Sequence, residues 1–305
     1  MVHWRTDRFA YFGGETALLE AWICNDLNTA PENAMIHYQL EMAGRVLFAQ
    51  KAPAQIPLCS SQFQGTLALP LPQVAKREQA IVRIGLIDRT GKIIHDSSVV
   101  LTIFPADEAV TDVPVYVIGK MDGKAHRLAR DLDLMVTDAI PAAFPDHARI
   151  LIDDLKLYTE HQSQILDGVR RGGRAIFLDL PLGEFDLAGQ PVSIVACDMN
   201  PRHFVSRQTG HPLVKDFQPD DFKFWFDEDA GYVTPLLPTT FQAEGWRAIL
   251  TSGNGGWEGT WYPTLAAAEK PLGRGSLILC QLSLAGRVKT NPSARIFALR
   301  LLSRL

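Results

Sequence analysis

Short runs of alternating apolar and polar residues dominate the first third of the chain. Residues 35–42 (MIHYQLEM) alternate cleanly, as a β-strand with one buried face does. Similar runs recur between residues 16 and 104, separated by turn residues such as those at 88–91, and no helical period interrupts them. About seven short strands at this spacing are typical of a sandwich. The pattern therefore predicts an all-β immunoglobulin-like sandwich over residues 1–106.

The pattern changes after an acidic, non-periodic segment at residues 107–113, which we interpret as a linker. Buried apolar runs that end near residues 119, 152 and 179 alternate with helical patterns. Such β-α-β alternation is typical of a parallel sheet with helices on both faces. The sequence thus predicts an α/β flavodoxin-like three-layer domain with a mostly parallel sheet over residues 114–305.

Two helices of this second domain have recognisable ends. One is expected to begin at Thr159, a plausible N-cap, and to end at the glycines 172–173. The other covers residues 292–302, where Ile296, Leu299 and Leu302 share one helical face. Between them, beyond Pro181, helical alternation stops and further strands are expected, some of them in hairpins.

Length and charge narrow the function classes. The 305 residues suggest about two domains. The 30 Lys and Arg against 34 Asp and Glu leave no basic excess for phosphate backbones, which argues against nucleic-acid binding. Apolar runs stay well short of the roughly 18 residues of a membrane span. The start of the chain lacks the pattern of a signal peptide, so we expect a cytoplasmic location and no membrane partner.

The usual motifs for metals and nucleotides are missing from the sequence. The four cysteines form no C-x-x-C pair, and the eight histidines form no HExxH. The glycine-rich segment at 253–259 lacks the Gly-Lys-Ser/Thr of a phosphate loop, and no G-x-G-x-x-G follows the first strand of the second domain. We therefore expect neither a metal nor a cofactor.

Carboxylates follow the predicted parallel strands. Asp153 and Asp154 come after one strand and Asp179 after the next, so they are expected at the carboxyl edge where α/β sheets bind ligands. They are candidates for a hydrolytic site, but Asp residues at strand ends also cap turns and helices. The bend at 153–159 holds no Ser or Cys, so nucleophilic catalysis is not expected there.

Aromatic side chains concentrate in one later segment. Residues 222–262 hold ten of the 27 aromatic residues and four of the six Trp. Trp and Tyr faces beside a carboxylate suit stacking on sugar rings, but such rings also fill cores and interfaces. The carbohydrate-binding candidates in this segment are Trp225, Trp257, Glu258, Trp261 and Tyr262.

Two parts of the chain resemble known families. Residues 14–26 and 35–42 resemble the immunoglobulin-like sandwich of family 2 glycoside hydrolases, the β-galactosidase relatives. Residues 115–305 resemble the class I glutamine-amidotransferase-like domain and the trimerisation domain of family 42 β-galactosidases, in pieces that include 150–153, 169–173 and 273–282. The amidotransferase nucleophile has no counterpart here. A catalytic barrel, which needs about 250 residues, does not fit beside the sandwich.

The resemblance implies a role in carbohydrate metabolism. Our first hypothesis is a non-catalytic accessory module of a glycoside hydrolase, giving assembly contacts or part of a carbohydrate site. One alternative is a glycoside hydrolase that uses the carboxylates at the sheet edge. Another is a purely structural oligomerisation unit. Whether the chain is an enzyme, which sugar it meets and how many copies assemble stay open at this point. The expected partners are a carbohydrate, a glycosidase catalytic domain or further copies of the chain.

Overall fold

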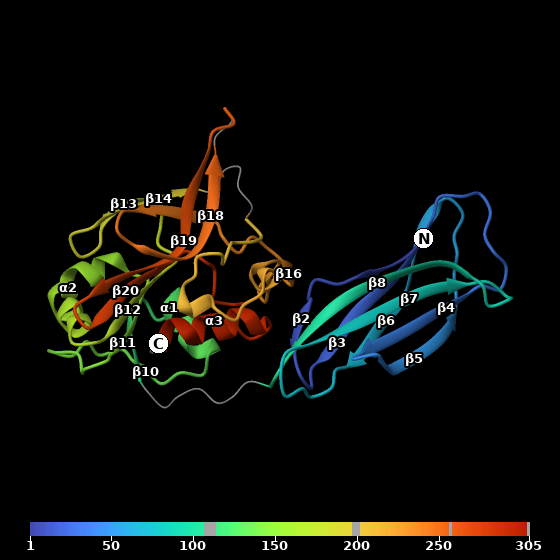
Figure 1. Ribbon diagram of the computed structural model, residues 1–305, viewed down its shortest axis with the longest axis horizontal. Coiled ribbons are helices and arrows are strands. Elements are labelled where there is room, and N and C mark those ends of the chain that lie inside the picture. The colour runs from blue at the N-terminus through green and yellow to red at the C-terminus, as the bar shows by residue number, and fades with distance from the viewer. Residues whose placement is uncertain (107–113, 197–201, 256–257, 304–305) are drawn as a thin grey trace. The chain divides into compact units, whose positions relative to one another are not determined.

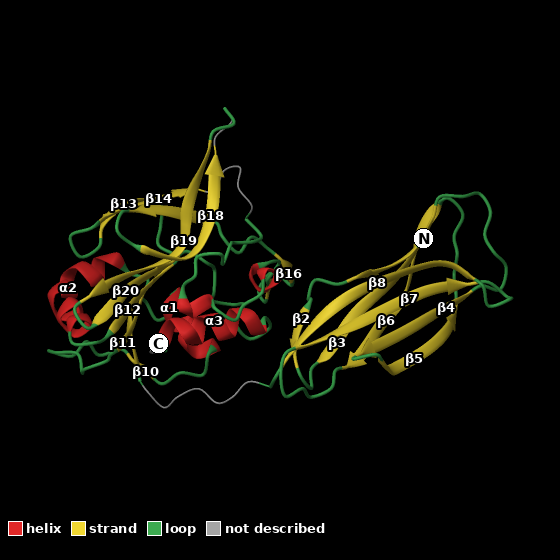
Figure 2. Ribbon diagram, in the orientation of Figure 1, coloured by secondary structure: helices red, strands yellow, loops and turns green. Residues whose placement is uncertain are grey.

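The chain divides into two compact units, Met1–Glu108 and Ala109–Leu305. The computed structural model describes residues 1–106, 114–196, 202–255 and 258–303, so the predicted linker at 107–113 lies outside the described residues. Within the described ranges there are twenty β-strands but three α-helices, and strands dominate both units (Figure 2).

Unit 1 is a β-sandwich of two sheets, as the alternating pattern predicts. Its strands are β1 (Val2–Arg5), β2 (Ala10–Phe12), β3 (Thr16–Asn25), β4 (Met35–Met42), β5 (Arg45–Pro53), β6 (Ser60–Pro70), β7 (Glu78–Ile87) and β8 (Ile93–Phe104). One sheet has the order β1-β3-β6 and the other β2-β8-β7-β4-β5 (Figure 1). The alternation in β4 buries Ile36, Tyr38 and Leu40 between the sheets, where they join the inward residues of β3 and β7. Burying these apolar faces drives the two sheets together.

Unit 2 has one large sheet with helices on both faces. Its strands are β9 (Val115–Ile118), β10 (Val136–Thr137), β11 (Arg149–Ile152), β12 (Arg174–Leu178), β13 (Gly183–Asp186), β14 (Pro191–Ala196), β15 (Phe226–Asp227), β16 (Tyr232–Val233), β17 (Thr239–Ala243), β18 (Arg247–Gly255), β19 (Trp261–Leu272) and β20 (Gly275–Cys280). Its α-helices are α1 (Lys124–Asp131), α2 (Leu155–Arg170) and α3 (Pro292–Leu302), and two short 3-10 helices cover Pro212–Val214 and Pro219–Phe222.

The predicted fold class is wrong for this unit. The strand order is β10-β9-β11-β12-β20-β19-β17-β14-β13, with β18 paired to β19. In this order, the first five strands, β10, β9, β11, β12 and β20, pair in parallel. The remaining pairings, beginning with that of β20 and β19, are antiparallel. The sheet is therefore mixed, and the domain is not a flavodoxin-like α/β fold with a mostly parallel sheet. The physical reason is that the chain beyond Pro181 returns through hairpins, which extend the sheet without the crossover helices that parallel strands require.

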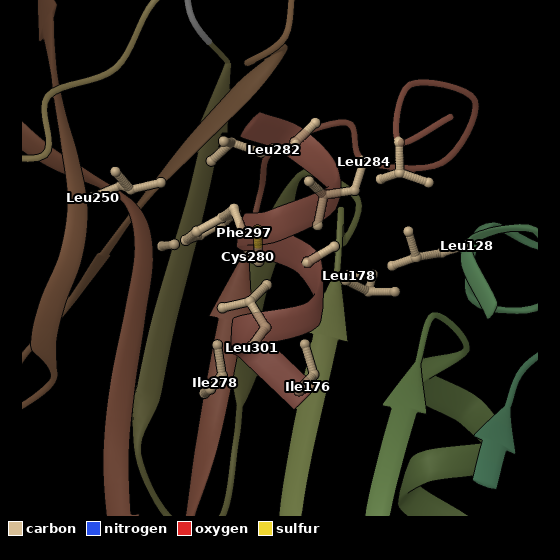
Figure 3. Close-up of a cluster of buried hydrophobic side chains, with 14 of the residues drawn as sticks. Leu128, Ile176, Leu178, Leu250, Ile278, Cys280, Leu282, Leu284, Phe297 and Leu301 are labelled. Atoms are coloured by element: carbon tan, nitrogen blue, oxygen red, sulfur yellow. The ribbon is translucent and has the colours of Figure 1, made fainter. Parts of the chain in front are cut away.

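The helices cover opposite faces of the sheet. Residues of α2 pack with one set of alternating strand residues, and residues of α1 and α3 pack with the other set. In Figure 3, Phe297 and Leu301 of α3 lie beside Ile278 and Cys280 of β20.

The final helix is present over the predicted residues, and the predicted buried face is correct in part. Leu302 is buried as expected, but Ile296 and Leu299 are only partly covered, and Phe297 and Leu301 are fully buried instead. Arg295 on this helix is also buried, and its guanidinium donates to the backbone oxygen of Asp131 at 2.8 Å.

Candidate functional site at the carboxyl edge of the sheet

The parallel strands of unit 2 bring three loops to one edge. Ile118 of β9 and Phe177 of β12 are both in register with Ile152 of β11. The segments that follow these strands therefore meet, as expected for the carboxyl edge of a parallel sheet. The predicted carboxylates Asp153, Asp154 and Asp179 all lie here.

Asp153 is held against the backbone at the start of α1. Its Oδ2 accepts a hydrogen bond from the amide of Ala125 at 2.9 Å. The two glycines beside it leave no room for a side chain: a Cβ on Gly119 would overlap Oδ1 of Asp153, and one on Gly123 would lie 2.5 Å from Oδ2. A carboxylate is favoured at a helix N-terminus by the unpaired amides and the helix dipole. Asp153 thus completes the start of α1.

Asp154 holds the start of α2 through hydrogen bonds from backbone amides. It is the N-cap residue, and its Oδ1 accepts from the amides of Lys156 at 2.9 Å and Leu157 at 3.1 Å. The sequence-based N-cap at Thr159 is wrong, because that residue lies inside the helix and its hydroxyl donates to the oxygen of Leu155. Asp is at least as good an N-cap as Thr, and Asp154 comes directly before the apolar-periodic segment.

Asp179 forms an ion pair with Lys124, the first residue of α1. Asp179 has φ +45°, a conformation that Asp adopts more readily than most residues, and its amide donates to the oxygen of Cys280 at 2.8 Å. The carboxylate is 12% exposed and the Lys124 side chain 55% exposed. The ion pair thus stands at the surface of the edge with its carboxylate sheltered.

The ion pair separates two depressions of about 570 and 750 Å³. Both are lined by Asp122, Gly123, Lys124, Asp179 and Pro238. We call the two together the edge cleft. The smaller depression is also lined by Arg127, Asp227, Asp229, Pro235, Leu282, Leu284 and Arg287, and the larger one by Lys120, Asp153, Asp154 and Leu182, among others.

Further ion pairs line the smaller depression. Arg127 holds Asp229 through two hydrogen bonds, one of them 2.8 Å from Nη2 to Oδ1. Arg287, whose side chain is 4% exposed, donates to Asp227 Oδ2 at 3.1 Å and to backbone oxygens of the neighbouring loop. The lining of the smaller depression therefore contains three ion pairs, in which each cation is matched by a carboxylate.

The pKa values of the two anions reflect these contacts. A hydrogen bond from Arg127 lowers the pKa of Asp229. For Asp227, burial opposes ionisation, but hydrogen bonds from Thr234 and from backbone amides, together with the charge of Arg287, lower the pKa below its usual value. Both groups are therefore held as carboxylates.

A thiol lies behind the edge cleft but is not poised for chemistry. Cys280 ends β20, is fully buried, and has a pKa raised by burial to about 12. A thiol with this pKa carries almost no thiolate near neutrality, and the thiolate is the nucleophile. The neighbouring Gln281 amide is structural, since it donates to the oxygen of Leu180 and accepts from its amide.

The aromatic candidates do not form one platform. Trp225 is 2% exposed, and its indole donates to the oxygen of Asp221 at 2.8 Å, so it belongs to the core. Trp261 is 58% exposed, and Tyr262 and Glu258 are also exposed on or beside the β18–β19 hairpin. Trp261 and Tyr262 are consecutive strand residues and point to opposite faces. Trp257 lies outside the described residues.

The cations of the edge cleft were not predicted from the sequence. Lys124 and Arg127 lie one turn apart at the start of α1, so a basic pair at this spacing in the predicted helix is the local signal that could have found them. Arg287 carries no such local signal, because it comes from a loop more than 100 residues away that folds back onto the edge.

Among the described residues, no group of three or more His, Cys, Asp and Glu side chains is placed to hold a metal ion. No helix within the described ranges has the length and apolarity needed to cross a membrane.

Comparison with known proteins gives only partial likeness in structure. No family model matches the sequence, and no curated protein matches it. Among solved structures, a β-galactosidase from Rahnella sp. R3 is 14% identical with a TM-score of 0.35, over 61% of this chain and 31% of that one. A β-glucuronidase from Parabacteroides merdae is 5% identical with a TM-score of 0.25, over 58% and 28% respectively. The chain thus corresponds to less than a third of either glycosidase.

A third similar structure corresponds to a smaller part of this chain. The fibronectin(III)-like modules of CbhA from Clostridium thermocellum are 10% identical with a TM-score of 0.21, over 34% of this chain and 96% of that one.

Proposed function

We propose that this chain is a non-catalytic carbohydrate-binding module and that the edge cleft holds the sugar. The observation that carries the proposal is the paired lining of the cleft, in which Lys124–Asp179, Arg127–Asp229 and Arg287–Asp227 place donors and acceptors side by side. Because the charges of these three pairs are each matched by a partner, this part of the lining offers fixed hydrogen-bonding groups whose charges largely cancel.

Such a wall suits a neutral, hydroxyl-rich ligand. A sugar hydroxyl both donates and accepts, so it can bridge a carboxylate and a neighbouring guanidinium or ammonium. An ionic ligand would instead meet a like charge next to each attractive one. Pro235, Pro238 and Leu282 supply apolar surface for the C–H faces of a ring.

The proposed lack of catalysis rests on how the predicted carboxylates are used. Asp153 and Asp154 accept hydrogen bonds from helix amides, which commits them to the starts of α1 and α2. The bend after β11 carries no Ser or Cys, and the thiol of Cys280 is buried. These features support binding rather than bond cleavage. The resemblance of residues 14–42 to glycoside hydrolase sandwiches supports an association with a glycosidase.

Calorimetric titration of the intact chain with a panel of neutral oligosaccharides tests the proposal. We expect saturable binding to at least one of them, weakened about tenfold by Lys124→Met, which removes one charged donor from the cleft. Lys156→Met is the matched control, because Lys156 is an exposed lysine on α2 that does not line the cleft. Absence of binding across the panel, or equal weakening by both variants, would refute the proposed site.

The exposed hairpin supports a second candidate, a structural oligomerisation unit. The ring of Trp261 lies over Gly255 on the facing strand, where even a Cβ would come within 3.1 Å of it, and more than half of Trp261 faces solvent. Such a ring can contact another copy of the chain. Light scattering that shows an oligomer dissociated by Trp261→Ala would favour this candidate, and a monomer at high concentration would remove it.

A further inference from the structure

A second cavity lies at the opposite, amino-terminal edge of the same sheet. Its volume is about 470 Å³, and its lining includes Arg149, Arg174, Glu269, Arg274 and Ser276. We call it the amino-edge cavity. It shares no lining residue with the edge cleft.

Three adjacent strands place residues from their beginnings in a row along this cavity. Arg149 of β11 is in register with Arg174 of β12, which is in register with Ser276 of β20. Residues two positions further along these strands, Leu151 and Ile176, pack in the core beneath α1 and α3. Because strand side chains alternate, the two arginines and the serine project to that same face.

Arg174 is fixed in place by the end of α3. Its side chain is 15% exposed, and Nη1 donates to the oxygen of Leu301 at 3.0 Å and to that of Ser303. A guanidinium is favoured at a helix C-terminus, where carbonyl groups lack intrahelical partners. Its Nη2 lies 3.6 Å from Glu269 Oε1. The guanidinium is thus preorganised at the cavity wall.

The cavity lining has a cationic excess. Three arginines line it against two carboxylates, Glu269 and Asp146. Both carboxylates also contact groups outside the lining: Glu269 Oε2 lies 3.1 Å from His211 Nε2, and Asp146 Oδ1 lies 3.2 Å from Arg171 Nε. Burial lowers the pKa of both Arg149 and Arg174; for Arg174 the charge of Glu269 opposes this effect, and the charge of Arg149 adds to it. Two guanidiniums that repel each other gain from an anion between them.

We propose that the amino-edge cavity binds an oxyanion of the phosphate or sulfate type, held by Arg149 and Arg174. Guanidinium groups match such anions through two parallel N–H donors. The Ser276 hydroxyl does not serve the anion, because it donates to Glu269. The volume is in the range of small-molecule sites, so it accommodates an ester as well as the free ion.

This site is independent of the proposed sugar cleft. It uses other residues at the other end of the strands, and it selects a charged group where the edge cleft selects a neutral one. Failure of either proposal therefore leaves the other standing.

Thermal unfolding and calorimetric titration of the full chain test the proposal. The probes are sodium phosphate, sodium sulfate and glucose 6-phosphate, each compared with sodium chloride at equal ionic strength. We expect phosphate or sulfate to raise the melting temperature in a saturable way that chloride does not reproduce. Tighter binding of glucose 6-phosphate than of phosphate would identify an ester site, and equal binding a site for the free ion.

Substitutions of the arginines test whether the anion binds in the amino-edge cavity. Arg149→Gln is expected to weaken the anion at least about tenfold. The side chain of Arg274 is 68% exposed, so Arg274→Gln should fold even if the first variant does not. We expect it to weaken anion binding less than Arg149→Gln does. Arg45→Gln in unit 1 is the matched control for removing an exposed charge. No stabilisation beyond chloride, or the same loss in all three variants, would overturn the proposal.

Discussion

At the two edges of the sheet in unit 2, side chains of opposite charge hold the helix ends for the same physical reason. At the carboxyl edge, Asp153 and Asp154 accept hydrogen bonds from the amides that begin α1 and α2. At the amino edge, Arg174 donates to the carbonyl groups that end α3. Each edge thus bears the charge that complements the helix ends there. The comparison teaches that charged residues at strand ends can serve mainly to hold the ends of the neighbouring helices. A binding role must then rest on the other charged groups that line the same edge.

The sharpest way to break this comparison is to remove the amino-edge cation. Arg174→Met keeps an apolar stem but leaves the carbonyls at the end of α3 and the carboxylate of Glu269 without their guanidinium. We expect a loss of about 3–5 kcal/mol in the free energy of unfolding, since a mostly buried charge pair is broken. Denaturant unfolding measures it, and a loss below about 1 kcal/mol would show that Arg174 does not hold the helix end.

At the carboxyl edge, Gly119→Ala tests how firmly Asp153 is held in its position. The Cβ introduced by Gly119→Ala would overlap Oδ1 of Asp153, so we expect a loss of about 1–3 kcal/mol. Gly85→Ala in β7 is the matched control, because a Cβ there has no atom within 4 Å. Chemical unfolding of both variants decides the matter: equal stabilities would mean that Asp153 moves aside freely.

The cap of α2 should show a smaller effect. Asp154→Ala removes the acceptor for two backbone amides and should cost about 1 kcal/mol, whereas Thr159→Ala should cost less than about 0.5 kcal/mol. Melting curves of the two variants compare the residues directly. If Thr159→Ala proved the more damaging, the helix would begin where the sequence pattern predicts it.

The smallest expected effect is on the stability of the protein at acidic pH. The pKa of Asp227 is lowered in the folded state, so its contribution to stability is present above its unfolded pKa of about 4 and is lost as the pH falls through the folded value. Asp227→Asn should therefore flatten the stability curve on the acid side of about pH 4. A curve unchanged in shape would show that Arg287 and Thr234 do not stabilise the carboxylate.

The sequence predicted those parts of the fold that depend on local pattern. The alternation at 35–42 places the core of unit 1, and the apolar runs near 118, 152 and 178 give the parallel strands. Strands and hairpins beyond Pro181 were also expected, but not that they extend the parallel strands into one mixed sheet. Which existing strand a later strand pairs with depends on where the chain returns, which no local pattern encodes.

The candidate site was predictable to a similar extent. Asp153 and Asp179 follow strands, so their place at the carboxyl edge follows from the sequence. Their partners do not: Lys124 comes from the next helix, and Arg287 from a distant loop. Long-range packing brings these charges together, and the same packing buries Trp225 while leaving Trp261 exposed.

The most direct test of the central claim is a crystal structure of the chain with a neutral oligosaccharide identified by titration. The account predicts density for the sugar in the edge cleft, with hydroxyl groups within hydrogen-bond distance of Lys124 and Asp179 and with its glycosidic bonds intact. Density stacked on Trp261 with an empty cleft, or a cleaved sugar beside Asp153, would contradict it.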